Sequence, residues 1–252
     1  MSKRCILTIT ASFVLTLFVY GSPVFAETTD EGVIYQSSEI KDVEKLFERA
    51  KHNISDIPKQ ELPQMVEQKG ILKGDKTSKE INSQSTTQLL KKEIKPNDAQ
   101  IQSFATTSFN IVTGKDLDVT SRSGRKYGED FDSSYGVRAY STLYYDEVTD
   151  SNGKVHYDLT RVSGGWDVND PTFNLSNQSV NYGAEGWSSY ANGYVRDQNS
   201  TRYLSGFSYT YYTPSSWYPI TFDTSWYIFG MNSYTDISKS GDTWELHLQN
   251  QY

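Results

Sequence analysis

The sequence predicts an all-β fold, an antiparallel β-sandwich or a barrel-like domain, over residues 105–252. Aromatic residues are dense in this part: Phe, Tyr and Trp make up 12 of the 32 residues of 203–234. That composition suits a pleated surface that is covered by other residues. Apolar and polar residues alternate along several segments, as they do on strands with one buried face. Turn-forming residues separate these segments at short intervals.

The clearest element is a hairpin in the first half of this domain. Its first strand includes 137–145, its return strand is 154–162, and the alternation places apolar residues of both strands on one face. The turn, 149–153, ends in Asn-Gly, which tolerates the positive φ of a tight turn. An earlier strand is expected over 108–112, and the charged stretch 122–132 is expected to be a loop.

The later strands follow from the same alternation. Gly164 and Gly165 are expected to end the return strand, because glycine weakens strand interiors. The segment 183–188 is interpreted as a turn, and Pro214 and Pro219 bound a connection that is not a central strand. Further strands are expected over 173–182, 190–196, 203–212, 222–234 with a bulge at Gly230, and 244–249.

The first 26 residues have the pattern of a secretory signal peptide. Two basic residues precede an uncharged, largely apolar run over 6–20, and positions 24–26 end in the small residues that a signal peptidase reads. The run is short for a membrane span, so an uncleaved anchor is the weaker interpretation. Cys5 is the single cysteine, so the rest of the chain has no disulfide and no thiol nucleophile. We therefore expect a secreted, extracellular, bacterial protein.

Residues 27–104 differ from the rest, with only three aromatic residues and many Lys, Glu, Gln, Ser and Asn residues. Such a segment buries too little apolar surface to offset the entropy of ordering, so we expect it to be mostly disordered. Apolar residues at 40, 43, 47 and 50 predict one helix, with Ser38 as its cap, and 88–94 is weakly helical. Three roles stay open: a flexible spacer, a pro-segment that masks the β domain, or a helix that docks on a partner or on that domain.

Charge excludes some partners. The formal net charge is −7, and residues 105–252 contain no basic stripe. Nucleic acid is therefore not an expected partner, and electrostatic binding to anionic lipid or teichoic acid is disfavoured.

Catalytic patterns are weak. His52 lies in the expected spacer, whereas His156 and His247 lie on polar faces of expected strands, where solvated side chains are the ordinary case. The sequence has no Gly-x-Ser-x-Gly and no His-x-x-x-His, so it predicts neither a serine hydrolase elbow nor a zinc site. Paired carboxylates can cleave a glycosidic bond when the fold brings them together. The candidates are Asp146, Glu147, Asp158, Asp167, Asp170 and Glu185.

Calcium is the one metal that the sequence favours, and no cofactor is otherwise required. Asp146, Asp150 and Asn152 supply oxygen atoms at one hairpin end, and Asp167 and Asp170 supply more in the next loop. Neither set matches the helix–loop–helix calcium motif. Turns in which the side-chain oxygens bind only the local backbone explain the same residues without an ion.

Aromatic residues in turns are the candidate ligand-binding residues. Trp217 and Tyr218, between two prolines, come first because loop residues of this size need a partner, and Trp187 and Tyr190 come next. Aromatic residues that cap the ends of the core would produce the same pattern. The favoured hypothesis is non-enzymatic binding to an extracellular glycan, a cell wall or a protein surface. A membrane-active, toxin-like β protein is the alternative, and membrane insertion belongs to that alternative only; a polysaccharide hydrolase is the third hypothesis.

Overall fold

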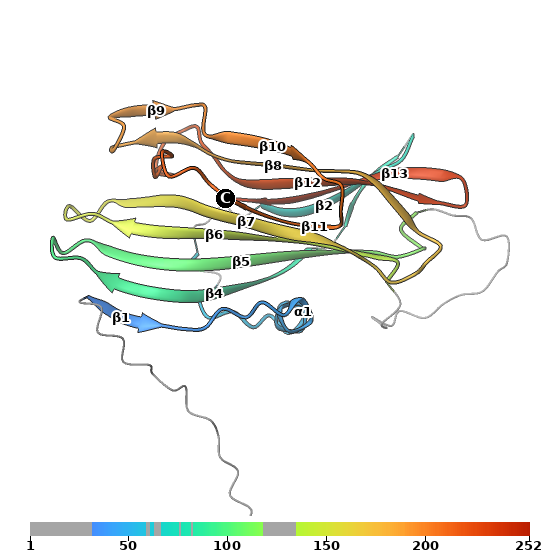
Figure 1. Ribbon diagram of the computed structural model, residues 1–252, viewed down its shortest axis with the longest axis horizontal. Helices are drawn as coiled ribbons and strands as arrows, with labels where there is room; N and C mark the ends of the chain where they lie inside the picture. The colour runs from blue at the N-terminus through green and yellow to red at the C-terminus, as the bar shows by residue number, and fades with distance from the viewer. Residues whose placement is uncertain (1–31, 59–60, 63–66, 76, 82, 118–134) are drawn as a thin grey trace, which may run out of the picture.

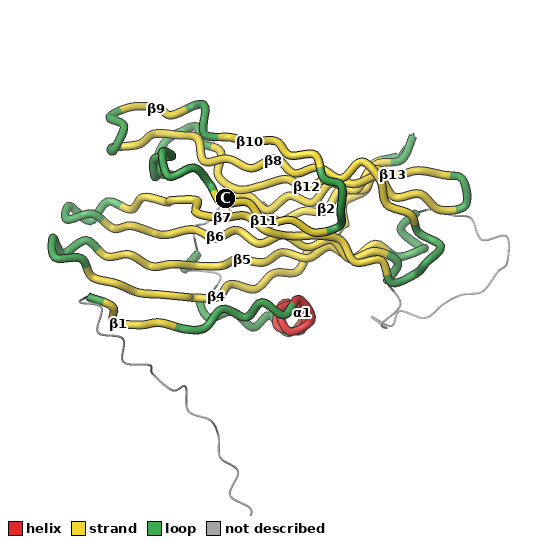
Figure 2. Tube along the Cα trace, in the orientation of Figure 1, coloured by secondary structure: helices red, strands yellow, loops and turns green. Residues whose placement is uncertain are grey.

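The computed structural model describes residues 32–252 except 59–60, 63–66, 76, 82 and 118–134. The described chain forms two antiparallel β-sheets and one short helix that lies beside one of them (Figure 1, Figure 2). The predicted all-β, antiparallel fold is therefore confirmed. The predicted signal peptide (1–26) and the predicted loop at 122–132 lie outside the described residues.

In the described residues the two sheets contain thirteen strands, and neighbours in each sheet are hydrogen-bonded. Sheet 1 has the order β1 (Val33–Gln36), β4 (Ser83–Ile94), β5 (Gln100–Val112), β6 (Val137–Thr149), β7 (Val155–Val168) and β11 (Ser208–Tyr212). Sheet 2 has the order β10 (Asn199–Tyr203), β8 (Asn174–Ser188), β12 (Ile228–Lys239), β13 (Asp242–Gln251), β2 (Glu67–Lys73) and β3 (Ser78–Ile81), and β9 (Gly193–Val195) pairs with β8.

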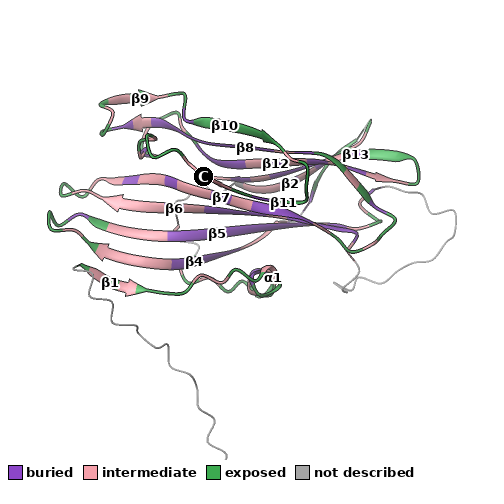
Figure 3. Cartoon of the chain, viewed as in Figure 1, coloured by how far each residue is buried: buried purple, intermediate pink, exposed green. Residues whose placement is uncertain are grey.

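The buried residues lie where the two sheets face each other (Figure 3). They include aromatic as well as aliphatic side chains. Alternate residues of a strand point to opposite faces, so the apolar positions predicted on one face of 137–145 are those that the core buries. The Tyr252 hydroxyl donates to the Tyr145 hydroxyl over 2.7 Å and lies 3.0 Å from the Thr106 hydroxyl. These hydrogen bonds offset the cost of burying the phenol groups.

A short segment joins the two sheets along one edge. Ile220 exchanges two backbone hydrogen bonds with Tyr157 of β7, at 2.7 and 2.9 Å. The Thr221 N–H donates to the carbonyl oxygen of Trp187 in β8 over 2.9 Å. Because neighbouring residues pair with both sheets, this segment covers strand edges that would otherwise present unpaired backbone groups.

The expectation of a mostly disordered spacer over 27–104 is not what the described residues show. β1 and β4 belong to sheet 1, and β2 and β3 belong to sheet 2. The predicted boundary at 105 falls inside β5. Residues 88–94, predicted as weakly helical, form part of β4. Low apolar content was misleading because polar side chains are buried in pairs, such as the hydroxyls of Thr87 and Thr106 at 3.0 Å. Removing 27–104 as a pro-segment would therefore take strands out of both sheets.

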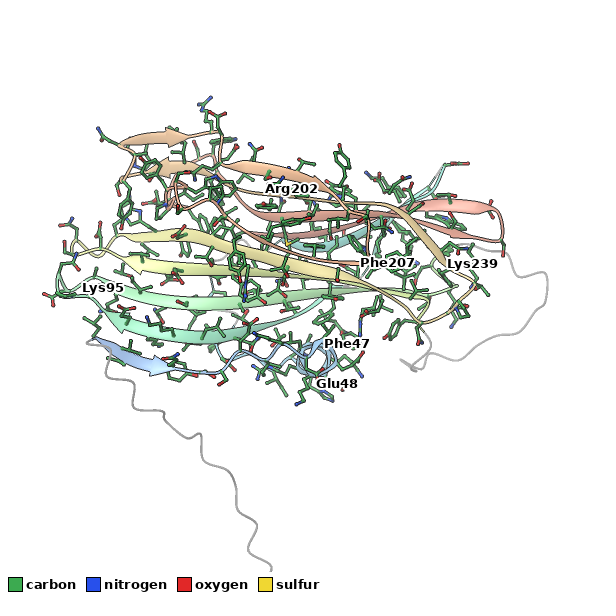
Figure 4. The ribbon with its side chains drawn as sticks, viewed as in Figure 1. Phe47, Glu48, Lys95, Arg202, Phe207 and Lys239 are labelled. Carbon is green, nitrogen blue, oxygen red and sulfur yellow. The ribbon has the colours of Figure 1, made fainter. Side chains whose placement is uncertain are left out.

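The predicted helix is present as α1 (Val43–Lys51). Its cap is Asp42, not Ser38, and the Asp42 carboxylate accepts the N–H groups of residues 44 and 45 at 3.0 and 3.2 Å. α1 lies on the outer face of sheet 1, where Leu46 and Ala50 pack on Phe109. Phe47 points toward the sheet and Glu48 away from it (Figure 4). Of the three roles left open by the sequence, this helix docks on the β domain itself.

The prediction that Gly164 and Gly165 end a strand is wrong, because β7 continues to Val168. A Cβ on Gly164 would lie 2.5 Å from the Tyr209 hydroxyl, and a Cβ on Gly165 would lie 2.8 Å from the Tyr140 hydroxyl. The missing side chains therefore make room for two tyrosine rings, one on each face of the strand. Residues 183–188, predicted as a turn, are likewise part of β8.

Candidate binding groove

The outer face of sheet 1 carries two cavities, which we call together the outer groove. The larger has a volume of about 490 Å³ and the smaller about 250 Å³, and Tyr144 and Arg161 line both. The larger cavity lies between the start of α1 with the segment before it and strands β5, β6, β7 and β11. The smaller cavity is lined by residues of β4, β5, β6, β7 and β11. Their remaining polar and charged walls include Glu39, Lys41, Thr107, Thr142, Asp146, Thr160, Ser163, Ser208 and Thr210.

Arg161 is the centre of the groove. Its guanidinium lies over the Tyr144 ring, 3.6 Å from the centroid, and 5.7 Å from the centroid of Tyr212. One guanidinium nitrogen donates to Glu39 over 3.1 Å, and the Tyr144 hydroxyl donates to the same carboxylate over 2.7 Å. Burial raises the pKa of Tyr144, which keeps its hydroxyl a donor at neutral pH. The result is a cluster of two aromatic rings and a guanidinium with hydrogen-bonding groups beside it.

Hydroxyl groups line the floor of the larger cavity. Thr107 and Thr142 are opposite each other on β5 and β6, and their hydroxyls lie 2.9 Å apart. Ser163 lies opposite Thr142 on β7, and its hydroxyl is 3.5 Å from that of Tyr144. Each hydroxyl both donates and accepts, so this floor suits a ligand that is itself rich in hydroxyl groups.

The wall segment, residues 37–42, is held in place mainly by its backbone. The Gln88 side chain, in a residue only 3% exposed, accepts the Ile40 N–H over 2.7 Å and donates to the Ile40 carbonyl over 3.2 Å. The Ser37 N–H donates to the carbonyl of Leu90 over 2.8 Å. A buried amide with both functions satisfied fixes the wall independently of the Glu39 side chain.

Arg138 anchors α1 beside the groove. Its side chain is 3% exposed and donates to both oxygens of the Glu44 carboxylate and to Asp167, the latter over 2.8 Å. The guanidinium lies 5.0 Å from the centroid of the Phe47 ring. Hydrogen bonding from Arg138 lowers the pKa of Glu44. This bidentate pair holds the helix at a defined position on sheet 1.

Among the predicted acids, Asp146 and Asp158 come to face each other across β6 and β7. Burial raises the pKa of Asp146, and burial together with the neighbouring Asp146 raises the pKa of Asp158 to about 6. Asp146 lines the smaller cavity. Two other acids accept hydrogen bonds from residues outside this pair: Asp167 from Arg138, and Glu185 from Asn199.

The predicted calcium ligands do not converge on one point. Asp150 accepts the N–H groups of Asn152 and Lys154, both at 2.9 Å, and so closes the hairpin turn. Asp170 binds Thr172 and Lys239, and hydrogen bonds from Thr172 together with Lys239 lower its pKa to about 2. Over the part of the chain that the structure describes, no group of three or more His, Cys, Asp or Glu residues is placed to hold a metal ion. Calcium binding stays a prediction.

The four predicted aromatic ligand-binding residues lie in three separate places. Trp217 packs against the ring of Tyr182, and Gln198 binds the backbone N–H and carbonyl of Tyr218, which is 45% exposed. Trp187 contacts Tyr194 at 5.4 Å between ring centroids, and Tyr194 contacts Trp226 at 6.2 Å. Tyr190 meets the ring of His156 edge-on. Of the described residues that line the outer groove, none is one of these four.

The expectation of solvated histidines on strand faces is wrong. His156 is 0% exposed and His247 is 8% exposed. The Ser189 hydroxyl and the Asp150 carboxylate lie 3.3 and 3.5 Å from His156, but both approach the same ring nitrogen, Nε2. A hydrolytic triad needs the acid on one nitrogen and the hydroxyl on the other, so these three residues do not form one.

The groove residues were partly visible in the sequence. The alternation of 137–145 predicted that residues 138, 140, 142 and 144 share one face, and Tyr140, Thr142 and Tyr144 all line the groove. The role of Glu39 had no sequence signal, because it depends on a contact over 105 positions.

No protein-family model matches the chain, and comparison with curated proteins and with solved structures found no significant similarity. In the described residues, no helix is long and apolar enough to cross a membrane. The geometry of the outer groove is therefore the basis for the functional argument.

Proposed function

We propose that this is a secreted, extracellular protein that binds a glycan in the outer groove without catalysing a reaction. The observation that carries the proposal is Arg161 lying over the Tyr144 ring within a concave, hydroxyl-lined surface. The larger cavity, about 490 Å³, falls in the ordinary size range of small-molecule sites. The predicted signal peptide supports the extracellular location.

A sugar matches these groups because it has apolar ring faces and hydroxyl edges. Tyr212, 70% exposed beside Arg161, offers a ring face on which a pyranose can pack. Arg161 supplies only donors, whereas the hydroxyls of Thr142 and Ser163 on the cavity floor both donate and accept, so together they can bind adjacent hydroxyls of one sugar. A concave site of this kind favours a glycan over the flat surface of a protein partner.

Binding without catalysis is supported by how the Glu39 carboxylate is engaged. Its Oε1 accepts from Tyr144 and its Oε2 accepts from Arg161, so both oxygens already have partners. A general acid for glycosidic cleavage must instead place a carboxyl oxygen on the leaving-group oxygen.

A glycan array, followed by calorimetry on the strongest ligand, tests the proposal with a matched pair of variants. Tyr212→Ala removes an exposed ring beside Arg161, whereas Tyr203→Ala removes a ring that is 86% exposed on β10 of sheet 2. We expect Tyr212→Ala to weaken binding about tenfold, or about 1.4 kcal/mol, and Tyr203→Ala to have no effect. Equal effects of the two variants would contradict a site in the outer groove.

The earlier candidates provide a second comparison. If Trp217→Ala with Tyr218→Ala abolishes binding while Tyr212→Ala does not, the site lies at the proline-bounded connection and not in the groove. Dye release from liposomes separates the membrane-active alternative, because a binding protein leaves the vesicles intact.

A further inference from the structure

We infer that the ligand of the outer groove carries a carboxylate, as an acidic sugar does, and that this carboxylate replaces Glu39 on Arg161 and Tyr144. The inference rests on the proposed function and names the class of glycan and the competition that controls its binding. In the described structure the Glu39 carboxylate occupies the position that we assign to the ligand carboxylate. It accepts hydrogen bonds from Tyr144 at 2.7 Å and from Arg161 at 3.1 Å. A carboxylate is thus the group that this position accommodates.

The charge of the larger cavity favours an acidic ligand, whereas the smaller cavity adds Asp146 at the other end of the groove. Of the described residues that line the larger cavity, three are charged: Glu39, Lys41 and Arg161. When Glu39 leaves, the cavity keeps two positive charges, although the whole chain has a formal net charge of −7. A concave surface whose charge opposes that of the whole protein concentrates ligands of the opposite sign.

The ion pair between Arg161 and Glu39 has fewer hydrogen bonds than the ion pair between Arg138 and Glu44. Arg138 donates from two nitrogens to both oxygens of Glu44. Arg161 donates to Glu39 from one nitrogen, and only one Glu39 oxygen accepts from it. A guanidinium has five N–H groups in a fork that fits a carboxylate with two parallel hydrogen bonds. A ligand carboxylate that approaches as Glu44 does would therefore bind Arg161 better than Glu39 does.

Glu39 can leave without unfolding the wall segment. The wall is held by the backbone of Ile40 on Gln88, so rotation of the Glu39 side chain breaks none of those bonds. Before a ligand arrives, Glu39 neutralises Arg161, whose side chain is only 20% exposed. A largely buried guanidinium without a counter-charge would be costly, so Glu39 serves as an internal competitor.

The test compares acidic oligosaccharides with their own methyl esters, which lose the carboxylate charge and keep the sugar. The probes are oligomers of glucuronic, galacturonic and sialic acids, each beside its ester, titrated calorimetrically into the wild-type protein and into Glu39→Gln. Glu245→Gln is the matched control, because Glu245 pairs with Lys73 at 3.2 Å on sheet 2. Thermal unfolding checks that each variant is folded.

We expect at least one acidic probe to bind about tenfold more tightly than its ester, and Glu39→Gln to strengthen that binding about tenfold. Glu245→Gln should change neither affinity, and Arg161→Lys, which keeps the charge but not the fork, should weaken the acidic probe about tenfold. Two outcomes would overturn this inference and leave the proposed function standing. In the first, neutral glycans bind and no acidic probe does. In the second, acid and ester bind equally and Glu39→Gln weakens the binding of both. If no glycan of either kind binds, both fail.

Discussion

Replacing Arg138 with alanine is expected to loosen α1 from sheet 1 and to destabilise the whole sandwich. The Arg138 side chain is 3% exposed, whereas its two partners, Glu44 and Asp167, are 66% and 42% exposed. The substitution therefore removes a buried cation that joins the helix to two strands, and it leaves two carboxylates close together. It also removes the guanidinium that packs on Phe47.

The loss of stability expected for Arg138→Ala depends on how exposed Glu44 and Asp167 are. Hydrogen bonds to charged groups contribute roughly 1.5–3 kcal/mol. Both carboxylates can return to water, so the larger penalty of a stranded buried charge, about 3–5 kcal/mol, does not apply. We expect Arg138→Ala to lower the free energy of unfolding by about 2–3 kcal/mol, which is about 4–12 °C in Tm for a chain of this size.

Urea unfolding followed by tryptophan fluorescence measures this change. Lys154→Ala is the control, because its ion pair with Asp223 spans 3.5 Å and is exposed on both sides; its loss should cost less than about 0.5 kcal/mol. Arg138 lowers the pKa of Glu44 in the folded state, so the stabilisation is present above the unfolded pKa of about 4.3 and disappears as pH falls through the lower folded value. Equal stability of the two variants at pH 7, or a difference as large at pH 2 as at pH 7, would refute the reasoning.

Two further predictions concern the strands. Gly230→Ala should destabilise the protein by at least about 2 kcal/mol, because Gly230 has a φ of +136° and an added Cβ would lie 2.4 Å from the Asn250 carbonyl oxygen; Gly206→Ala, with nothing within 4 Å, should be nearly neutral in the same denaturant titration. Asp158→Asn should raise Tm at pH 7.5 and not at pH 4. The folded pKa of Asp158 is raised to about 6, so its unfavourable charge appears only as pH rises from the unfolded value through 6; an equal change in Tm at both pH values would count against this.

Local chemistry was sufficient to predict the hairpin of β6 and β7. Alternation placed residues 137–145 correctly on their two faces, and Asn-Gly marked the turn. The register above the turn was not predictable, because a bulge lies between Tyr144 and Tyr145 in the pairing with β7. Without that irregularity Tyr144 would lie opposite Thr160, whereas the bulge brings Arg161 opposite it and creates the centre of the groove.

Composition was misleading wherever contacts between residues distant in the sequence decide the secondary structure. Residues 27–104 contain few aromatic residues, yet β4 lies between β1 and β5, and the hydroxyl of its buried Thr87 pairs with that of Thr106 in β5. The glycine pair in β7 suggests a strand end by its local preference, but two tyrosines from neighbouring strands fill the space that it leaves. In both cases the segment has a low intrinsic tendency to form a strand, and the residues that stabilise the strand come from other parts of the sequence.

The sequence by itself determined the all-β class, the helix within residues 40–51, and the polar face of β6 that lines the groove, since these depend on period and on short-range turn chemistry. Tertiary structure alone decided that Glu39, Tyr144 and Arg161 meet, and that Trp217 packs on the core side while Tyr212 stays exposed. The physical reason is that burial and ion pairing depend on which strands become neighbours. Those neighbours are set by the combined stability of both sheets, which no single segment encodes.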